Sequence, residues 1–224
     1  MTARKKGANC GSGGAPVEPR KTRIQAINEK RILNAAQEVF AHYGYHGATI
    51  DGIADKAEMS KPNLHYYFKT KKDLYNAVLK RTLEHWLAPL SELDPAGDPA
   101  EELRSYIAEK VEMSRKNPTA SRLFASEILQ GAPFVKDYLR KELKELVDRK
   151  ASVLRGWVAE GRLADVDPYH LIFLIWAATQ HYADFAPQVR LVTGTARMNK
   201  AHFKQVEESL CSIILNGVLP PRTT

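Results

Sequence analysis

The stretch from Thr49 to Leu74 reads TIDGIADKAEMSKPNLHYYFKTKKDL and predicts short helices in quick succession. Thr49, Ser60 and Thr70 each stand just before a segment with apolar residues at helical spacing, where a hydroxyl is a typical N-cap. Asp73 follows Thr70 at the spacing of a capping box, which strengthens the third start signal. The stretch therefore predicts two short helices followed by the beginning of a longer one.

A tight turn at Glu58 and Met59 joins the first two helices, an arrangement that indicates a helix-turn-helix. In this motif the first helix braces the DNA backbone, and the N-terminal residues of the second reach base edges in the major groove. Lys61 can donate to guanine acceptors, and Asn63 carries the donor and acceptor pair that matches adenine. The DNA-contacting set that we expect is Thr49, Ser60, Lys61, Pro62, Asn63, His65, Tyr66, Lys69 and Lys72.

Two further groups of residues in the stretch have distinct roles. His65, Tyr66 and Lys69 suit phosphates and sugars, and Lys72 lies at a helix N-terminus whose free N–H groups favour an anion. Leu64, Tyr67 and Phe68 are interpreted as core residues that hold the second helix against the apolar faces of the preceding ones.

Helical periodicity extends over nearly all of the remaining chain. Apolar residues between positions 32 and 40 recur at helical spacing, and Gly44 stands where a C-terminal cap is expected. Pro187 and Gly194 are interpreted as marking a loop. Further helices are expected over about 70–89, 103–116, 120–130, 134–160, 169–185 and 197–215. The sequence therefore predicts an all-α fold of about nine helices, divided into a disordered basic tail (1–25), a helix-turn-helix domain (26–80) and a larger helical domain (81–224).

Positive charge is concentrated at the N-terminal end. The first 81 residues carry 15 Lys and Arg against seven Asp and Glu, a net charge of +8, so the remaining 143 residues contribute −1 to the total of +7. This asymmetry points to an anionic partner at one end, either nucleic acid or an anionic membrane, unless the charges only solvate the surface. Cations expected to add non-specific affinity in the tail are Arg4, Lys5, Lys6, Arg20, Lys21 and Arg23.

Several other classes of protein are disfavoured. The longest apolar run, 171–178, is far shorter than the roughly 20 residues that span a bilayer. No apolar stretch follows the basic N-terminus, as a secretory signal would require. Cys10 and Cys211 lack the spacing of a zinc site or a disulfide framework and are interpreted as free thiols in a reducing compartment. We therefore expect a cytoplasmic protein that binds no membrane.

An enzyme is the first alternative, and its best candidates are histidines. His42 and His46 are four residues apart, but Gly44 between them is expected to end the helix, which leaves no shared zinc-binding face. His181 and Asp184 can pair on one helix, although a structural histidine is favoured. No Ser or Cys lies in a recognisable nucleophile setting. We therefore expect no catalytic residue, cofactor or metal. A membrane-surface protein is the second alternative, for which the stretch offers no broad apolar face.

One family combines these features over about 50 residues. The relevant positions are Phe40, Gly44, Tyr45, Thr49, Ile53, Ala54, Ala57, Ser60, Leu64, Tyr66, Tyr67, Phe68, Lys71 and Leu74. This pattern resembles the DNA-binding domain of the TetR family of transcriptional regulators, with one departure at Glu58, where the family commonly has Gly. The resemblance implies a homodimer that binds an operator in double-stranded DNA and releases it when a small molecule occupies the C-terminal domain.

The C-terminal part carries a narrower resemblance. The segments WLAPL (86–90), ASRLF (120–124), GAP (131–133), HLIF (170–173) and TQHYADFAPQV (179–189) are similar to the RutR subgroup of this family. That subgroup comprises pyrimidine-responsive regulators of pyrimidine use. The resemblance implies a pyrimidine effector such as uracil or thymine, with a different small apolar effector as the alternative.

One face of the expected helix 169–185 suits such a ligand. Phe173, Trp176, Ala177, Gln180 and Asp184 recur on it and form a mostly apolar wall with two polar groups, as small-molecule pockets usually have. The Gln180 amide offers a donor and an acceptor side by side, like the N–H and C=O edge of a pyrimidine. The full set expected to bind the effector is Trp86, Lys110, Phe124, Phe173, Trp176, Gln180 and Asp184.

The last two expected helices are too apolar for solvated surfaces. Their apolar residues are Leu171, Ile172, Leu174, Ile175, Val206, Leu210, Ile213 and Ile214. Some of these must pack inside the subunit. The remainder predict an isologous four-helix interface between two copies of the chain.

Overall fold

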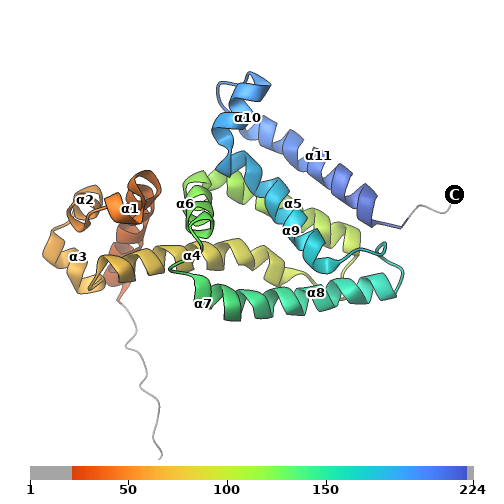
Figure 1. Ribbon diagram of the computed structural model, residues 1–224, viewed down its shortest axis with the longest axis horizontal. Helices are drawn as coiled ribbons and strands as arrows, with labels where there is room; N and C mark the ends of the chain where they lie inside the picture. Colours follow the sequence, from red (N-terminus) through yellow and green to blue (C-terminus); the bar gives the residue numbers. More distant parts are fainter. Residues whose placement is uncertain (1–21, 221–224) are drawn as a thin grey trace, which may run out of the picture.

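The computed structural model describes residues 22–220, and all regular structure within this range is helical (Figure 1). The helices are α1 (Arg23–Gly47), α2 (Ile50–Lys56), α3 (Lys61–Tyr67), α4 (Lys71–Glu92), α5 (Pro99–Lys116), α6 (Pro118–Leu129), α7 (Lys136–Tyr138), α8 (Lys144–Ala159), α9 (Pro168–Asp184), α10 (Ala186–Thr193) and α11 (Lys200–Val218). A π-helical turn, η1 (Leu139–Leu143), joins α7 to α8 without a break. The all-α class expected from the sequence is confirmed.

The three N-caps expected around the helix-turn-helix are present. Thr49 accepts a hydrogen bond from the backbone N–H of Gly52, and Ser60 accepts one from that of Asn63. Thr70 forms a complete capping box with Asp73 at the start of α4. Each hydroxyl satisfies a backbone donor that the first helical turn leaves without a partner, so the boundaries of α2, α3 and α4 follow from local sequence.

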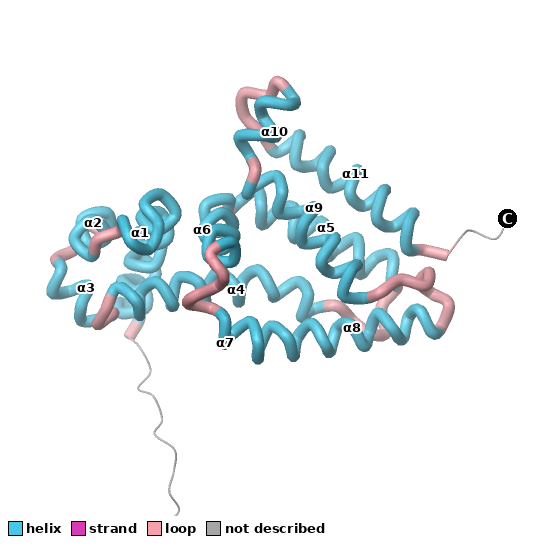
Figure 2. The backbone as a smooth tube through the Cα atoms, viewed as in Figure 1, coloured by secondary structure: helices cyan, strands magenta, loops and turns pink. Residues whose placement is uncertain are grey.

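The sequence interpretation was wrong about α10, which it treated as a loop. Pro187 lies in the first turn of this helix, where its missing N–H removes no helical hydrogen bond. Gly194 follows the last turn with a φ of 67°, a left-handed conformation that is common at a C-cap. The two residues therefore bound a helix instead of interrupting the chain between helices (Figure 2).

The expected tail also ended too late, because α1 begins at Arg23. Thr22 Oγ1 accepts from the Gln25 N–H at 3.3 Å, and Gln25 Oε1 accepts from the Thr22 N–H at 2.8 Å. This reciprocal capping box starts the helix within the segment that the basic composition had suggested was disordered. The rest of the expected tail, with Arg4, Lys5, Lys6, Arg20 and Lys21, lies outside the described residues.

Two buried apolar clusters organise the fold. One lies in the N-terminal module and includes Phe40, Ile53 and Leu64, and the other surrounds α5, which packs against α9 and α11. The first cluster also contains Leu123 and Val135, which lie well beyond the boundary expected near residue 80. The helix-turn-helix module therefore shares its core with α6 and with the segment that follows it.

Helix α4 connects the two regions, running from α1–α3 along the larger domain (Figure 1). Helix α6 stands between them and contacts both α1 and α9. Within residues 22–220, no helix combines the length and apolar character needed to cross a membrane.

Candidate DNA interface and effector cavity

The turn between α2 and α3 accommodates Glu58 in a left-handed conformation, with a φ of 50°. This conformation costs a non-glycine residue roughly 1–2 kcal/mol. The Arg31 guanidinium of α1 donates to the Glu58 carbonyl oxygen at 2.9 Å and to its carboxylate Oε2 at 2.8 Å. The ion pair places the carboxylate beside α1, and the helix-turn-helix geometry is kept without glycine.

Helix α3 presents most of the predicted DNA-contacting residues to solvent. Lys61, Pro62, Asn63 and Tyr66 are exposed, and the exposed fraction of Tyr66 is 62%. Leu64, by contrast, is completely buried against α1 and α2, as expected for a core residue. One side of α3 therefore anchors the helix, and the other is free to contact a partner.

Lys61 and His65 are among the predicted DNA contacts that already interact within the molecule. Lys61 Nζ lies 3.0 Å from Asp51 Oδ2 in an exposed ion pair, which is worth about 0–1 kcal/mol and can be exchanged for DNA at little cost. His65 is half-buried, with Nδ1 3.3 Å from the carbonyl oxygen of Phe68 at the end of α3. The His65 ring is therefore less available for a phosphate than the sequence suggested.

The remaining predicted DNA contacts are two exposed lysines and two exposed hydroxyls that cap helices. Lys69 and Lys72 are exposed and form no ion pair with another described residue. Thr49 and Ser60 use a lone pair to cap their helices, but each hydroxyl keeps a hydrogen that it can donate to a phosphate. Lys71 differs from Lys72 because its Nζ donates to the Ala48 carbonyl oxygen at 2.9 Å and fixes α4 against the α1–α2 connection.

The first turns of α1 brace α3, a contact that sequence reasoning missed. Gln25 Nε2 donates to the Tyr66 hydroxyl at 3.2 Å, and Asn28 Nδ2 donates to the Tyr67 hydroxyl at 3.1 Å. Tyr67 is half-buried. No local sequence pattern predicts these hydrogen bonds, because they join residues about 40 positions apart.

A cavity of about 40 Å³ lies within the larger domain, between α4, α5, α6, η1 and α9. Its lining consists of Thr82, Leu83, Trp86, Leu87, Lys110, Phe124, Leu143, Trp176 and Gln180. Five residues of the predicted effector set are brought together here: Trp86, Lys110, Phe124, Trp176 and Gln180. Sequence reasoning missed the four others. Leu83 and Leu87 could have been predicted, because they lie next to Trp86 on α4. No feature of the sequence indicates Leu143, which lies on the π-helical turn.

The polar groups of the cavity have few partners. Lys110 is buried, and its Nζ lies 4.1 Å from the centre of the Trp86 ring. Burial lowers the pKa of Lys110 to about 7, against the opposing attraction of Asp184. Trp86 Nε1 is buried without a hydrogen-bond partner among the described residues, and the Gln180 side chain makes no hydrogen bond within them. An indole N–H donor and a side-chain amide are therefore left for a ligand to satisfy.

The other indole is held firmly. Trp176 Nε1 donates to the Tyr106 hydroxyl at 2.5 Å, and Tyr106 is itself buried in the main core. The two indoles thus differ, since the N–H of Trp176 is already used and that of Trp86 is not.

Phe173 and Asp184 do not line the cavity. Phe173 is 50% exposed and faces an outer groove, while Asp184 accepts a short hydrogen bond from the Ser121 hydroxyl of α6. Burial raises the pKa of Asp184, against the effects of this bond and of the neighbouring cations. The helical face expected to form one wall is therefore divided: Trp176 and Gln180 occupy its inner edge, and Ala177 is exposed.

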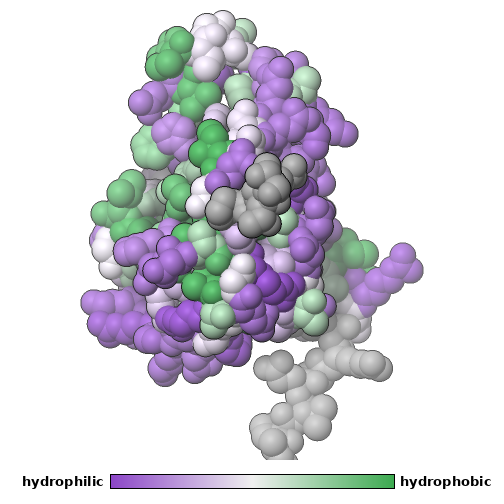
Figure 3. All heavy atoms as spheres, turned by 90° about the vertical axis from the view of Figure 1, so that its right-hand side faces the viewer, coloured by the Kyte–Doolittle hydropathy of each residue, from purple (hydrophilic) through white to green (hydrophobic). Residues whose placement is uncertain are grey.

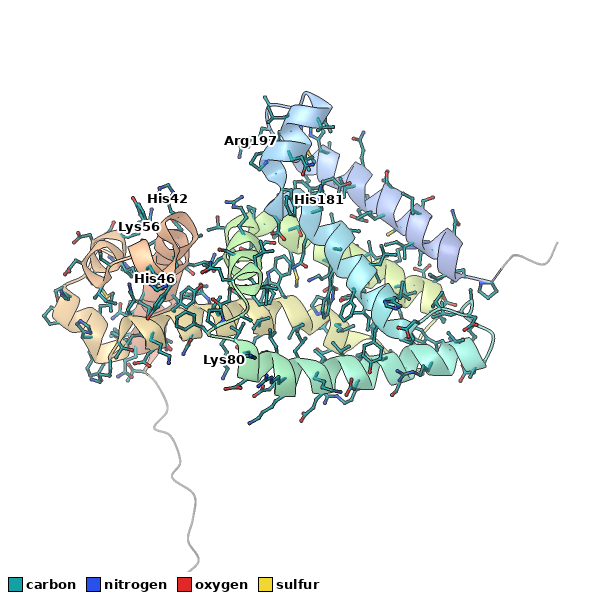
Figure 4. All side chains as sticks on the ribbon, in the orientation of Figure 1. His42, His46, Lys56, Lys80, His181 and Arg197 are labelled. Atoms are coloured by element: carbon teal, nitrogen blue, oxygen red, sulfur yellow. The ribbon has the colours of Figure 1, made fainter. Side chains whose placement is uncertain are left out.

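Of the histidines considered as enzyme or metal candidates, His181 lies apart from His42 and His46. Figure 4 shows His42 and His46 on the helix-turn-helix module and His181 on α9 in the larger domain. His181 stacks on Phe185, with ring centres 5.0 Å apart. Among residues 22–220, no cluster of three or more His, Cys, Asp or Glu side chains is arranged to hold a metal ion.

Comparison with known proteins covers both regions. The family described as "Bacterial regulatory proteins, tetR family" matches residues 32–78, and "YcdC-like protein, C-terminal region" matches residues 79–221. The chain is 45% identical over 208 residues to the HTH-type transcriptional regulator RutR of Escherichia coli K12, covering 93% of this chain and 98% of the relative. It is also 37% identical over 107 residues to the transcriptional activator FasR of Mycolicibacterium smegmatis, covering 47% and 48% of the two chains.

Solved structures agree with these matches. A TetR-like transcriptional regulator from Rhodococcus sp. RHA1 superposes with a TM-score of 0.63 at 25% identity, covering 88% of this chain and 98% of that one. The ketosteroid regulator KstR2 of Mycobacterium tuberculosis has a TM-score of 0.67 at 19% identity, covering 92% and 98%, and shows a shared fold alone. On these matches, which extend over both regions, the chain belongs to the TetR family of transcriptional regulators.

Proposed function

We propose that this regulator is a homodimeric repressor that holds an operator until a pyrimidine, such as uracil or thymine, occupies the cavity beside Trp86. The observation that carries the proposal is the convergence of a flat indole, an unpaired indole N–H and an unpaired Gln180 amide on one small cavity. Such a cavity suits a planar ring with an N–H and C=O edge.

The polar atoms of the cavity match those of a pyrimidine. The Gln180 amide can both accept from a ring N–H and donate to the neighbouring carbonyl oxygen. Trp86 Nε1 can donate to a carbonyl oxygen, which would relieve the cost of a buried donor without a partner, about 1–3 kcal/mol. Lys110 could meet the remaining polar edge of the ring, since its amino group can donate a hydrogen bond in either protonation state. A purine would need additional space for its second ring, and adenine also lacks the N–H and C=O edge.

The size of the cavity suggests how binding would act on DNA. At about 40 Å³ it is far smaller than the roughly 150 Å³ of a cavity that can hold benzene, so a six-membered ring requires the walls to move. Phe124 is one such wall and belongs to α6. Expansion around the ring would therefore displace the helix that stands between the two regions.

Helix α6 is bonded directly to the helix-turn-helix module. The buried Glu127 carboxylate accepts from the Tyr75 hydroxyl of α4 at 3.2 Å and from the Phe134 N–H at 2.6 Å. Tyr75 and Phe134 in turn pack against the Tyr45 ring of α1, with centres 5.0 and 4.4 Å away. Movement of α6 would favour a placement of α3 that misfits the operator, so effector and operator would each weaken the binding of the other.

On the DNA side, we assign sequence preference to Lys61 and Asn63 and general affinity to Tyr66, Lys69 and Lys72. The exposure of these residues on one face of α3 and the start of α4 supports this division. Pro62 would contact the base edges from the first turn. Two helix-turn-helix modules of a dimer would read half-sites about one helical turn of DNA apart, or a multiple of that distance.

Apolar surface left on α9 and α11 supports the dimer. Leu174 is 52% exposed and Ile213 is 71% exposed, whereas Leu171, Ile172 and Ile214 are buried within the subunit. Apolar side chains also reach the surface at the end of the molecule opposite α2 and α3 (Figure 3). The regulator would act in the cytoplasm as a dimer of this kind, with residues 26–80 binding DNA and residues 81–224 binding effector and partner.

Calorimetric titration of uracil, thymine and adenine into the protein tests the effector. We expect uracil or thymine to bind in the micromolar range, about 8 kcal/mol, and adenine not to bind. A mobility-shift assay with operator DNA should then show release by the bound pyrimidine alone. Gln180→Leu should still bind the operator but lose the response, because an apolar side chain cannot pair with the ring edge. If none of the three bases binds, the pyrimidine assignment is wrong.

A further inference from the structure

A groove of about 700 Å³ lies outside the effector cavity, between the α7–η1–α8 helix and α9. Its floor is apolar and includes Leu139, Leu143, Val147, Phe173 and Trp176. Leu143 and Trp176 also line the cavity. The groove and the cavity are therefore neighbouring spaces that share two side chains as a common wall.

The two parts of this wall differ in how firmly they are held. Trp176 is fixed by its hydrogen bond to the buried Tyr106 hydroxyl. Leu143 is partly exposed and is held only by apolar packing at the edge of the main core. Since the indole is anchored, the width of the opening between cavity and groove depends on the side chain at position 143.

The π-helical turn explains why Leu143 occupies this place. A π turn inserts one residue into an α-helix, which rotates the following side chains by about 100° relative to an uninterrupted helix. Leu143 is the last residue of the turn, directly before α8. Such turns occur frequently at functional sites. Here the insertion brings a branched apolar side chain against Trp176 instead of continuing the helical register.

We propose that Leu143 is the size-selecting residue of the effector site, confining the ligand to a bare ring by closing the cavity against the groove. With a smaller side chain at this position, the site would extend along the apolar floor and admit a pyrimidine ring that carries an alkyl chain. This inference rests on the proposed function for the identity of the ring, but the wall between the two spaces does not depend on it.

Leu143→Ala and Leu139→Ala form a matched pair for the test, because Leu139 lines the groove and not the cavity. Uracil and uracils with a butyl chain at N1, C5 or C6 are titrated into each protein by calorimetry. The wild type should prefer uracil by about 100-fold, within the range that pocket size alone achieves. In Leu143→Ala this preference should fall to about tenfold or less for at least one isomer, and in Leu139→Ala it should stay unchanged.

A second readout needs no pyrimidine. Acrylamide quenching of tryptophan fluorescence should increase in Leu143→Ala relative to the wild type, because the wall that shields Trp86 is opened, and should not increase in Leu139→Ala. Leu143→Val, a milder truncation, should show a smaller change in both assays and covers the case in which the alanine variant unfolds.

The outcomes separate the two proposals. If uracil does not bind the wild type, but quenching still increases in Leu143→Ala alone, the pyrimidine assignment is rejected. The inference that Leu143 separates the cavity from the groove then still holds. Unchanged preference and unchanged quenching in a folded Leu143→Ala protein would overturn the inference about Leu143. A wild type that binds butyluracils as tightly as uracil would overturn it as well.

Discussion

The two functional regions of this regulator are built in opposite ways. The surface that we propose to bind DNA comes from one short stretch, Thr49 to Lys72, whose caps and turn residues specify its helices locally. The cavity that we propose for the effector collects residues from Thr82 to Gln180, contributed by separate helices that only tertiary packing brings together. A local surface can be recognised from sequence spacing, whereas a cavity between helices depends on which side of each helix turns inward.

The comparison also shows where the two regions cease to be separate. The apolar cluster of the helix-turn-helix module includes Leu123 of α6, and the buried Glu127 carboxylate of the same helix bonds to Tyr75 and Phe134, which both pack in that cluster. A ligand in the cavity would therefore act on the helix-turn-helix module directly through α6. This helix supplies one wall of the cavity and also part of the module's core.

The largest effect is expected from truncation of this shared core. Leu64→Ala removes a completely buried side chain and should lower the free energy of unfolding by about 2–5 kcal/mol. Because the cluster extends to Leu123 and Val135, unfolding monitored by circular dichroism and by calorimetry should remain a single transition at a lower temperature. Two resolved transitions, with only the first one shifted, would show instead that the regions are independent.

The next effect concerns the buried lysine of the cavity. Lys110 has a folded-state pKa of about 7, below its ordinary value of 10.5, so between these pH values the unfolded chain binds more protons than the folded protein. The free energy of unfolding should therefore gain a contribution as pH rises from 7 to 10.5, and this contribution is absent below pH 7. Urea denaturation across this range should show a flatter pH dependence for Lys110→Met. Parallel curves for the two proteins would contradict the assignment.

On the DNA surface, Asn63→Ala should weaken binding to the cognate operator by about 1–3 kcal/mol and relax preference at one base position. The measurement is a set of binding curves against operators with single-base changes, with the effector absent. Specificity that survives the substitution unchanged would mean that α3 is placed differently in the groove.

The junction between the regions gives a smaller, more selective effect. Glu127→Gln keeps the shape of the side chain but weakens the bond from the Tyr75 hydroxyl, and should change the coupling between effector and operator by about 0.5–2 kcal/mol. Effector affinity is measured with and without operator, using Ser126→Ala on an exposed site of the same helix as the control. A coupling equal to that of the control would rule out Glu127 as the connection.

The smallest expected effect separates two adjacent lysines. Lys72→Ala should weaken binding to all DNA sequences alike and reduce the slope of affinity against salt concentration by about one unit. Lys71→Ala should instead lower thermal stability, because Lys71 bonds to the Ala48 carbonyl oxygen and lies 4.7 Å from the Tyr45 ring centre. Identical salt slopes in the wild type and Lys72→Ala would exclude a phosphate contact at position 72.

The sequence by itself determined the helix-turn-helix, because caps, turns and helical periodicity are local properties of the backbone. Thr49, Ser60 and Thr70 start their helices as expected, and Leu64 is buried as expected. The family assignment followed from the same residues. The sequence interpretation failed at Pro187, which starts α10 instead of marking a loop, and at Thr22, whose capping box starts α1 inside the expected tail.

Only the tertiary structure decided how the larger domain uses its residues. The sequence placed Phe173, Trp176, Gln180 and Asp184 on one helical face, but the packing of α9 against α5 and α6 sends Trp176 and Gln180 to the cavity, Phe173 to the outer groove and Asp184 to Ser121. Leu143 reaches the cavity because a π-helical turn shifts its register. Lys110 of α5 is shielded from solvent because α4, α6, η1 and α9 close around it. Burial and side-chain direction arise from contacts between distant segments, which spacing along one helix does not encode.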